Sequence, residues 1–389
     1  MRFLHTSDWH VGRTIRGRPR TDEFAAALDE LVAIARDQAV DAVLIAGDMF
    51  DGRASNPDAE RLVFETFARL ATEKIAVVAI PGNHDSAARW NALRPLLDPL
   101  HVRLVPFVVP PEQGSVIEVP ARGSEEAALV ACVPFVPERM FGSAASLFAG
   151  SERWAQDYAQ GMGDLLEAMA SAFRPHKVNL LMAHLFATDV TLGGGENAFT
   201  VTLDYAVPPA RFPAIAQYVA LGHVHMPQVV RASPAPARYA GSLLQLDFGE
   251  AEQRKSVAIV DVDPDRPANA HEIPLRSGRR LSEVSGTLDD IRKLAPSLGD
   301  AWLRVTVRTD APVPGIADEV RELLPNAVDV RTEFPRHEED VAATGIVRLD
   351  PREQYLAYYR TKHGNAPSPE LLTAFAETYE AVRGSGGDA

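Results

Sequence analysis

The sequence predicts an α/β protein in which two stacked mixed β-sheets are flanked by helices. Short apolar runs such as 42–46 and 75–80 alternate with segments of helical periodicity, which is typical of buried parallel strands joined by helices. Shorter runs near 227–231, 237–240 and 256–262 are broken by Gly and Pro and indicate antiparallel pairing. Strands in two groups with helices beside them favour two sheets that are covered by helices.

The elements of the first part of the chain alternate between strand and helix. The first helix carries Phe24, Leu28 and Leu31 on one face, and the second begins at Pro57 with Asn56 as its N-cap. A third helix is expected over 87–97. Core packing is the default explanation for the apolar residues of the second and third helices, and a contact between two copies of the chain is the alternative. The remaining strands are expected at 2–5, 102–109, 115–119, 128–133, 178–183 and 218–221, and a long helix is expected over 151–173.

The chain divides into three parts. Residues 1–270 are predicted to form one α/β domain, which ends at the turn-rich segment 263–267. Residues 279–345 show a helix and a strand twice and are predicted to form a small α+β domain. Residues 351–383 carry two amphipathic helices, which are too short to be stable alone and therefore favour docking on a partner or on the body of the chain. Their apolar stripes contain Tyr355, Tyr359, Leu371, Leu372, Phe375, Tyr379 and Val382.

Clusters of Asp, Asn and His follow five of the apolar runs. Because parallel strands would bring these clusters to one edge of a sheet, we expect their side chains to converge. Each cluster alone has an ordinary explanation as a turn or a structural histidine, but the five together predict two metal ions held close to each other. The predicted ligands are Asp8, His10, Asp48, Asn83, His184, His223 and His225.

The mixture of oxygen and imidazole donors predicts the metal. Asp48 follows Gly47, which lets the backbone come close to an ion, and its carboxylate can place one oxygen on each of two ions. Mixed oxygen and imidazole ligands without thiolates suit manganese, iron or zinc, and the set favours two Mn²⁺ ions, with Fe²⁺ or Mg²⁺ as possible substitutes.

His84 is the candidate catalytic residue. Asn83 and His84 are neighbours that point in different directions, so Asn83 can bind metal while His84 faces the substrate. Asp85 would hold the His84 ring and support its protonated form. The alternative is that His84 is a further ligand or belongs to the start of a helix.

One dense basic run follows His10 directly. It contains Arg13, Arg16, Arg18 and Arg20, which would hold phosphates without reading bases, unless the run is a solvated loop. Ser242, after Gly241, would shape a turn beside the site and contact the substrate; a purely structural turn is equally consistent.

These motifs resemble a known family. The blocks Asp8-Trp-His10, Gly47-Asp48-Met-Phe-Asp51, Gly82-Asn-His-Asp85, Ala183-His184 and Gly222-His-Val-His225 resemble the calcineurin-like metallophosphoesterase family. The opening Thr6-Ser-Asp-Trp-His10 and the block Tyr239-Ala-Gly-Ser242, with Phe248-Gly-Glu250, are similar to the DNA nuclease branch of that family.

The resemblance implies a role for each matching residue. One Mn²⁺ would be bound by Asp8, His10, Asp48 and His225, and the other by Asp48, Asn83, His184 and His223. His84 would be the catalytic histidine, with Asp85 behind it. The resemblance also implies a homodimer, a DNA-capping role for residues 279–345, and docking of residues 351–383 on the coiled coil of an SMC-like ATPase.

The implied activity is that of a nuclease subunit in an ATP-dependent DNA-repair complex. It would act as a 3′→5′ exonuclease on double-stranded DNA ends and as an endonuclease at hairpins or blocked ends. Hydroxide generated by the two metals would attack the phosphodiester while His84 assists the leaving group. A metallophosphoesterase acting on phosphoproteins or on small cyclic or nucleotide esters could use the same first 270 residues. A non-catalytic binding module is disfavoured by the complete ligand set.

Composition agrees with a soluble cytoplasmic protein. We expect neither a secretory signal nor a membrane span, and the single cysteine, Cys132, excludes a disulfide within the chain. The net charge of −14 argues against nonspecific binding to nucleic acid. Two divalent ions would add about four positive charges at the site and weaken that objection.

Overall fold

The computed structural model describes residues 1–137, 158–196 and 206–335. It also describes scattered residues near the C-terminus: 355–356, 358–360, 362, 366–368, 371–372 and 375. The chain forms two compact units, of which one comprises Met1–Thr306 with Ala317–Arg331 and the other Val307–Ile316 with Thr332–Ala389. All the predicted metal ligands lie in the first unit.

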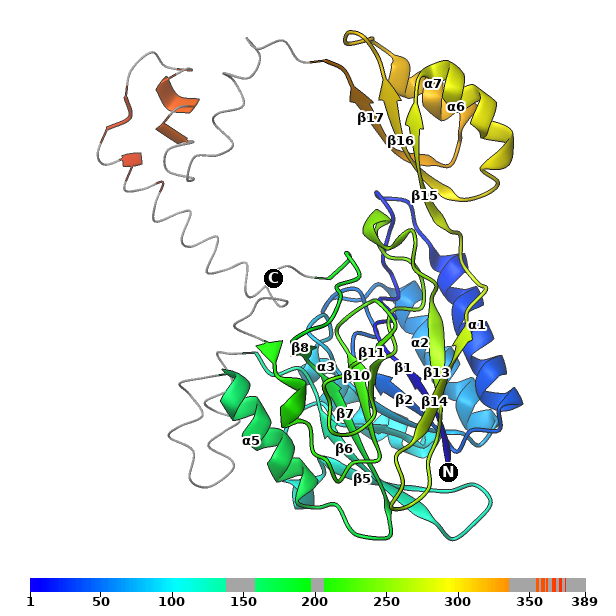
Figure 1. The fold of residues 1–389 in the computed structure, drawn as a ribbon, viewed down its shortest axis with the longest axis vertical. Coiled ribbons are helices and arrows are strands. Elements are labelled where there is room, and N and C mark those ends of the chain that lie inside the picture. The colour runs from blue at the N-terminus through cyan, green and yellow to red at the C-terminus, as the bar shows by residue number, and fades with distance from the viewer. Residues whose placement is uncertain are drawn as a thin grey trace. The chain divides into compact units, whose positions relative to one another are not determined.

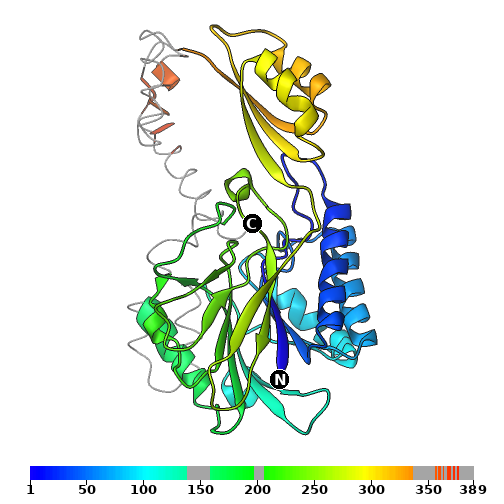
Figure 2. The same ribbon diagram turned by 45° about the vertical axis from the view of Figure 1, so that its right-hand side comes forward.

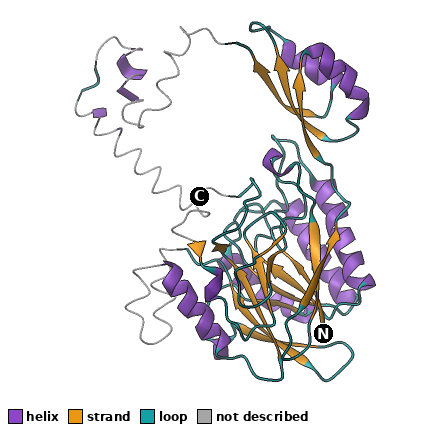
Figure 3. Ribbon diagram, viewed as in Figure 1, coloured by secondary structure: helices purple, strands orange, loops and turns teal. Residues whose placement is uncertain are grey.

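Two six-stranded sheets form the centre of the first unit (Figure 3). The strand order of the first sheet is β14 (Asn269–Pro274), β13 (Ser256–Asp261), β1 (Arg2–Thr6), β2 (Ala42–Ala46), β3 (Ala76–Ile80) and β4 (Val102–Leu104). In this sheet β1 to β4 run parallel, and β13 is antiparallel to β1. In the second sheet the four central strands run parallel; its order is β11 (Gln228–Val229), β12 (Ala237–Tyr239), β10 (Tyr218–Gly222), β7 (Val178–His184), β6 (Ala127–Val133) and β5 (Val116–Pro120).

Helices cover the outer faces of both sheets (Figures 1 and 2). The first sheet packs against α1 (Thr21–Asp37), α2 (Pro57–Thr72) and α3 (Ala87–Leu97), and the second packs against α5 (Tyr158–Ala170). The Asn56 side chain accepts a hydrogen bond from Ala59 N–H, which confirms the predicted N-cap of α2. The predicted sandwich of two mixed sheets between helices is confirmed.

Strand β2 shows why the central runs are apolar throughout. Leu44 and Ala46 belong to the core between the sheets, together with Leu180 of β7. Val43 and Ile45 point the other way, into the core beneath the helices. A strand buried on both faces carries no polar alternation, so its sequence is a continuous apolar run.

The first domain extends beyond the expected boundary at residue 270. After the turn at 263–267 the chain returns to the first sheet as β14, which pairs antiparallel with β13. This strand lies at the edge of the sheet and is mostly exposed, so it has no apolar run by which the sequence would reveal it. Strand β4 is also shorter than expected, and residues 151–157 of the long predicted helix lie outside the described residues.

Two small sheets complete the described structure. One pairs β8 (Phe186–Ala187) with β9 (Ala206–Val207). The other has the order β15 (Leu281–Gly286), β16 (Trp302–Arg308) and β17 (Ala327–Glu333), with α6 (Leu288–Leu294) and α7 (Ile316–Leu323) between its strands in the sequence. The predicted pair of helix–strand units is therefore present, with one additional strand, β15, ahead of it.

Only part of the C-terminal segment is described. Residues 355–356, 358–360, 362, 371–372 and 375 are helical, and the rings of Tyr355 and Phe375 stack with their centroids 4.2 Å apart. The remainder of the two helices expected over 351–383 lies outside the described residues. No helix in the described parts of the chain combines the length and the apolar character that crossing a bilayer requires.

Gly222, at the end of β10, tests how closely the two sheets approach. A Cβ at this position would lie 1.9 Å from the carbonyl oxygen of Ala46, at the end of β2. Gly222→Ala would therefore force the strand ends apart, and we expect it to lower the free energy of unfolding by about 1–3 kcal/mol in urea titrations with EDTA present. Gly123→Ala is the matched control, because no atom lies within 4 Å of its added Cβ. Equal stability of the two variants would contradict this close approach.

Candidate metal centre

The predicted ligands all lie at the carboxyl ends of strands. Those that follow strands of the first sheet are Asp8 and His10 after β1, Asp48 after β2, and Asn83 after β3. Those from the second sheet are His184, the last residue of β7, and His223 and His225 after β10. The structure brings these seven side chains together in one cluster, in which all but the half-buried Asn83 are buried.

The backbone turns sharply where it presents these side chains. Asp8, His10, Asp48 and His223 have φ angles of 50°, 48°, 51° and 101°, in the left-handed region that residues other than glycine rarely adopt. Hydrogen bonds from Asp8 N–H to Gly47 O and from His10 N–H to Asp48 O, of 2.9 and 3.0 Å, hold the first two turns side by side. Backbone strain of this kind persists only where the surrounding structure enforces it, and it is found most often at functional sites.

Asp48 lies between the two groups of donors. Its Oδ2 is 3.7 Å from His10 Nε2 and 3.4 Å from His184 Nε2, while its Oδ1 accepts the His84 N–H at 2.8 Å. Burial alone would raise the pKa of Asp48, but His184, His84 and His10 together hold it well below its usual range. The carboxylate is therefore ionised and central, as a bridge between two cations requires.

The donors around His184 fit a cation. His184 Nδ1 lies 2.8 Å from the carbonyl oxygen of Ala46, which can only accept, so in the neutral ring Nε2 carries the lone pair. His184 Nε2 is 3.1 Å from Asn83 Oδ1, and Asn83 Oδ1 is 2.9 Å from His223 Nδ1. Burial lowers the pKa of His184, but Asp48 outweighs burial and raises it to about 9. A positive charge is therefore favoured between His184 Nε2, Asn83 Oδ1 and His223 Nδ1, and a divalent cation would supply it.

His10 fits a metal ligand for a different reason. Its ring is fully buried, yet neither nitrogen has a hydrogen-bond partner among the described residues, although Nδ1 lies 3.4 Å from Asp51 Oδ1. Burial lowers the pKa of His10, which keeps the ring neutral and able to coordinate. Donor atoms of Asp8, His10 and His225 lie within 4.8 Å of one another. Buried polar atoms are rarely left without a partner, so this group also fits a cation.

Glu250 and Lys255 are site residues to which sequence analysis gave no role. Glu250 Oε1 is 3.0 Å from His225 Nδ1, and Glu250 Oε2 is 2.7 Å from Lys255 Nζ. Burial would raise the pKa of Glu250, but Lys255 and His225 lower it to about 2. The block Phe248-Gly-Glu250 marks Glu250 as part of a family motif, but it does not reveal the partners of Glu250, because the contacts with His225 and Lys255 exist only in the fold.

The structure corrects the role expected for Asp85. Its two carboxylate oxygens accept the backbone N–H groups of Met49, Phe50 and Gly82, each at 3.1 Å, and so they bind the loops instead of the His84 ring. His84 Nδ1 instead lies 2.8 Å from the carbonyl oxygen of Asp51. Burial, followed by the charge of Asp48, raises the pKa of Asp85 to about 6.

Two of the expected DNA contacts are buried. The Arg20 guanidinium is enclosed, where it pairs with Glu23 at 2.8 Å and donates to the carbonyl oxygen of Gln245 at 2.5 Å. Ser242 is also buried, and its hydroxyl donates to Leu244 O at 2.8 Å. Both positions are structural because neither side chain can reach a substrate.

The other basic side chains of the run are more accessible. Arg13 pairs with Asp51 at 3.1 Å and Arg16 with Asp329 at 3.3 Å, and both side chains keep part of their surface exposed. Arg18 is exposed and has no ion-pair partner among the described residues.

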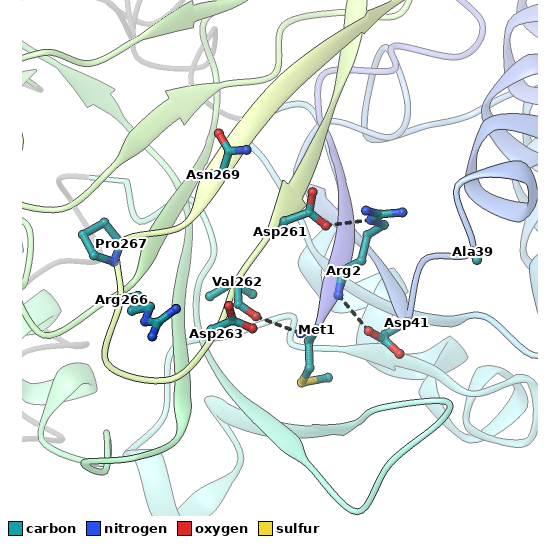
Figure 4. A pocket seen from close by; sticks show the side chains of 10 residues that line it. All are labelled: Met1, Arg2, Ala39, Asp41, Asp261, Val262, Asp263, Arg266, Pro267 and Asn269. Carbon is teal, nitrogen blue, oxygen red and sulfur yellow. Dashed lines mark hydrogen bonds and ion pairs between the residues drawn. The ribbon is translucent and has the colours of Figure 1, made fainter.

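A cavity of about 440 Å³ lies at the opposite end of β1 (Figure 4). Several of its polar groups already have partners: the Met1 amino group donates to Val262 O at 2.8 Å, and Arg2 pairs with Asp261 at 2.7 Å. None of the predicted metal ligands lines this cavity. The cluster around Asp48 is therefore the stronger candidate for a functional site.

Comparison with known proteins finds relatives along the whole chain. Residues 1–227 match the family described as calcineurin-like phosphoesterase, and residues 277–361 match the type 5 capsule protein repressor C-terminal domain. The chain is 31% identical to the protein of Bacillus subtilis named as the D subunit of the nuclease SbcCD, with 98% of each chain covered. It is 30% identical to the protein of the same name in Rhodobacter capsulatus (84% and 85% covered) and 24% identical to that in Staphylococcus epidermidis (92% and 93% covered).

Asp85→Asn tests whether this carboxylate holds the loops of the centre. The amide offers one acceptor oxygen in place of two and points N–H donors at backbone N–H groups. We expect a loss of about 1–3 kcal/mol in the free energy of unfolding of the metal-free protein, measured in urea. The exposed Asp58→Asn, in the first turn of α2, is the control. A stability loss no larger than that of the control would contradict the loop-holding role.

Proposed function

The chain belongs to the calcineurin-like phosphoesterase family, and within it to the D subunits of SbcCD nucleases, and from this we propose that it is a Mn²⁺-dependent DNA nuclease subunit. The family resemblance predicted from the motifs is confirmed, and the chain is a metal-dependent phosphoesterase. The proposed activities are 3′→5′ exonuclease action on double-stranded ends and endonuclease action at hairpins or blocked ends. The proposed role is in DNA repair, within a complex whose other subunit uses ATP.

The observation that carries the proposal is the position of Asp48 between two donor groups from different sheets. Mixed oxygen and imidazole donors favour Mn²⁺ over ions that prefer all-oxygen shells. Bound at these groups, two cations would polarise the phosphoryl group and make a nucleophilic water available near neutral pH. One ion would be held by Asp8, His10, Asp48 and His225, and the other by Asp48, Asn83, His184 and His223.

His84 is the residue proposed to act on the substrate. Its ring is half-buried, and Nδ1–H donates to Asp51 O, which fixes the ring and leaves Nε2 for another partner. Its neighbour Asn83 contacts His184 and His223, so the two side chains take different sides of the centre. In the doubly protonated ring, Nε2–H would stabilise charge on a phosphoryl oxygen and give its proton to the departing 3′ oxygen, which leaves the neutral ring with its proton on Nδ1.

The accessible side chains of the basic run are proposed to contact the DNA backbone. Arg13, Arg16 and Arg18 follow His10 in the sequence, and phosphate contacts from such side chains position a duplex without reading its bases. A second group of arginines, Arg254 and Arg276 among them, lines a cavity of about 450 Å³ and offers further positive charge in an acidic chain. Arg20 and Ser242 are left out because they are buried.

The proposed partners are a second copy of the chain and an SMC-like ATPase. The relatives are named as parts of SbcCD, so the ATPase proposed here is SbcC, and residues 351–383 are its proposed docking segment. Trp90 and Phe67 on the helices considered for dimer contact are buried, and they belong to the core. Leu96 of α3 is 69% exposed and remains available for a contact between two copies.

Incubation with DNA tests the proposed function. Purified protein with Mn²⁺ should release nucleotides from the 3′ ends of an end-labelled duplex, and EDTA should abolish the release. Asp48→Ala should abolish both the activity and the binding of both ions, as counted by mass spectrometry of bound metal. Turnover of a small cyclic or nucleotide phosphodiester without any cleavage of DNA would instead support the alternative phosphoesterase. An Asp48→Ala variant that retains two ions would refute the bridge.

His84→Ala separates catalysis from metal binding. We expect the variant to keep both ions and to lose about 10²–10⁴-fold in turnover, since general acid catalysis contributes a factor of this size. His101→Ala, at an exposed histidine outside the cluster, should match the wild type in both respects. A His84→Ala protein that has lost one ion would identify His84 as a ligand, because donor atoms of His84, His10 and Asp48 lie within 4.8 Å of one another.

A further inference from the structure

The backbone of His225 is held by hydrogen bonds on both its N–H and its carbonyl side. Its N–H donates to Glu196 Oε1 at 2.9 Å. Its carbonyl oxygen accepts from Lys255 Nζ at 2.9 Å and from Ser242 N–H at 3.1 Å. The residue therefore has little freedom to move along its own chain.

The His225 ring is oriented by Glu250. Glu250 Oε1 lies 3.0 Å from His225 Nδ1, and both side chains are buried, with exposures of 0% and 3%. A carboxylate accepts, so Nδ1 carries the proton and Nε2 is left with the lone pair for a cation. A second carboxylate that fixes the tautomer and rotation of a ligating histidine is a recurrent device in metal sites.

Lys255 completes the group by occupying the other oxygen of Glu250. Its Nζ is 2.7 Å from Glu250 Oε2, and the same oxygen accepts Leu246 N–H at 2.9 Å. Nζ also donates to His225 O and to Gln253 Oε1, each at 2.9 Å, so its three N–H groups have three acceptors. Because Lys255 is only 5% exposed and Glu250 is fully buried, the pair is shielded from solvent.

A buried ion pair of this kind is weak evidence for stability. The cost of removing both charges from water is comparable to their attraction, and apolar pairs of similar volume are often as stable or more so. The charges also cancel, so the pair orients His225 without adding net negative charge to a centre already rich in carboxylates. A role in positioning accounts for the pair better than a role in folding.

We propose that Glu250 and Lys255 form a positioning pair for His225, which presents the His225 ring to the cation of the group Asp8, His10 and His225. The inference rests on the metal centre proposed above. It assigns these two residues to one of the two ions only, because no contact links them to Asn83, His184 or His223 among the described residues.

The test replaces the pair by apolar residues of similar size in the full chain. Glu250→Leu with Lys255→Met leaves no unpaired buried charge but removes the acceptor of Leu246 N–H, so the double variant should fold with a melting temperature lowered by only about 2–8 °C in EDTA. Titration with Mn²⁺, with bound metal counted at each step, should show one ion weakened by about 10–100-fold and the other unchanged. Glu250→Gln with Lys255→Met, which retains a neutral acceptor for Nδ1–H and leaves no unpaired buried charge, should recover part of the affinity lost in the apolar double variant.

A second background shows whether the pair acts through His225. In His225→Ala protein, adding Glu250→Leu and Lys255→Met should cost no further metal affinity, whereas a general loss of structure would cost the same in both backgrounds. The matched control is Arg20→Met with Glu23→Leu, which removes a comparably buried ion pair away from the predicted ligands. It should leave the affinity for both ions at the wild-type value.

The outcomes separate this inference from the function on which it rests. A folded Glu250→Leu, Lys255→Met variant that binds both ions as tightly as the wild type would overturn the positioning role, and so would an equal loss in the Arg20, Glu23 control. A wild-type protein that binds fewer than two ions would instead overturn the proposed metal centre.

Discussion

The centre depends on one arrangement: the carboxylate of Asp48 lies between donors that two different sheets carry. His10 comes from the first sheet and His184 from the second, and both approach the same oxygen of Asp48. The approach is possible because no side chain separates the strand ends, since a Cβ on Gly47 would lie 2.1 Å from the His184 ring. The core between the sheets fixes the distance between them, so the same packing also fixes the distances between the donor atoms.

This arrangement of donors costs free energy in the metal-free protein. Left-handed backbone at four of the predicted ligands costs on the order of 1–3 kcal/mol for each residue, and His10 adds two buried nitrogens that form no hydrogen bond with the described residues. Strands buried on both faces provide the stabilisation that offsets this strain. The fold therefore holds the donors in place before any cation arrives, and binding need not include the entropic cost of ordering them.

The sequence predicts well which donor side chains converge, because each one follows a strand, and the topology of parallel strands determines where strand ends meet. It predicts local partners less reliably. Asp85 was expected to hold the neighbouring His84, but the backbone of the loop after β2 occupies it. Arg20 donates to the carbonyl oxygen of Gln245, and Glu250 accepts from the His225 ring. The partners in each pair are distant in the sequence and meet only in the folded chain. Edge strand β14 was missed because an exposed strand carries no apolar run.

Asp51 contacts both the basic run and the predicted metal centre, so it affects how this acidic chain would bind DNA. Its carboxylate pairs with Arg13 and lies 3.4 Å from His10 Nδ1, and its carbonyl oxygen holds the His84 ring. Arg13 thus already has an anionic partner where a phosphate would approach, as Arg16 has in Asp329. We infer that a DNA phosphate would replace these carboxylates, so that binding exchanges one ion pair for another. Such an exchange would place substrate binding in direct contact with Asp51, whose carbonyl oxygen orients His84.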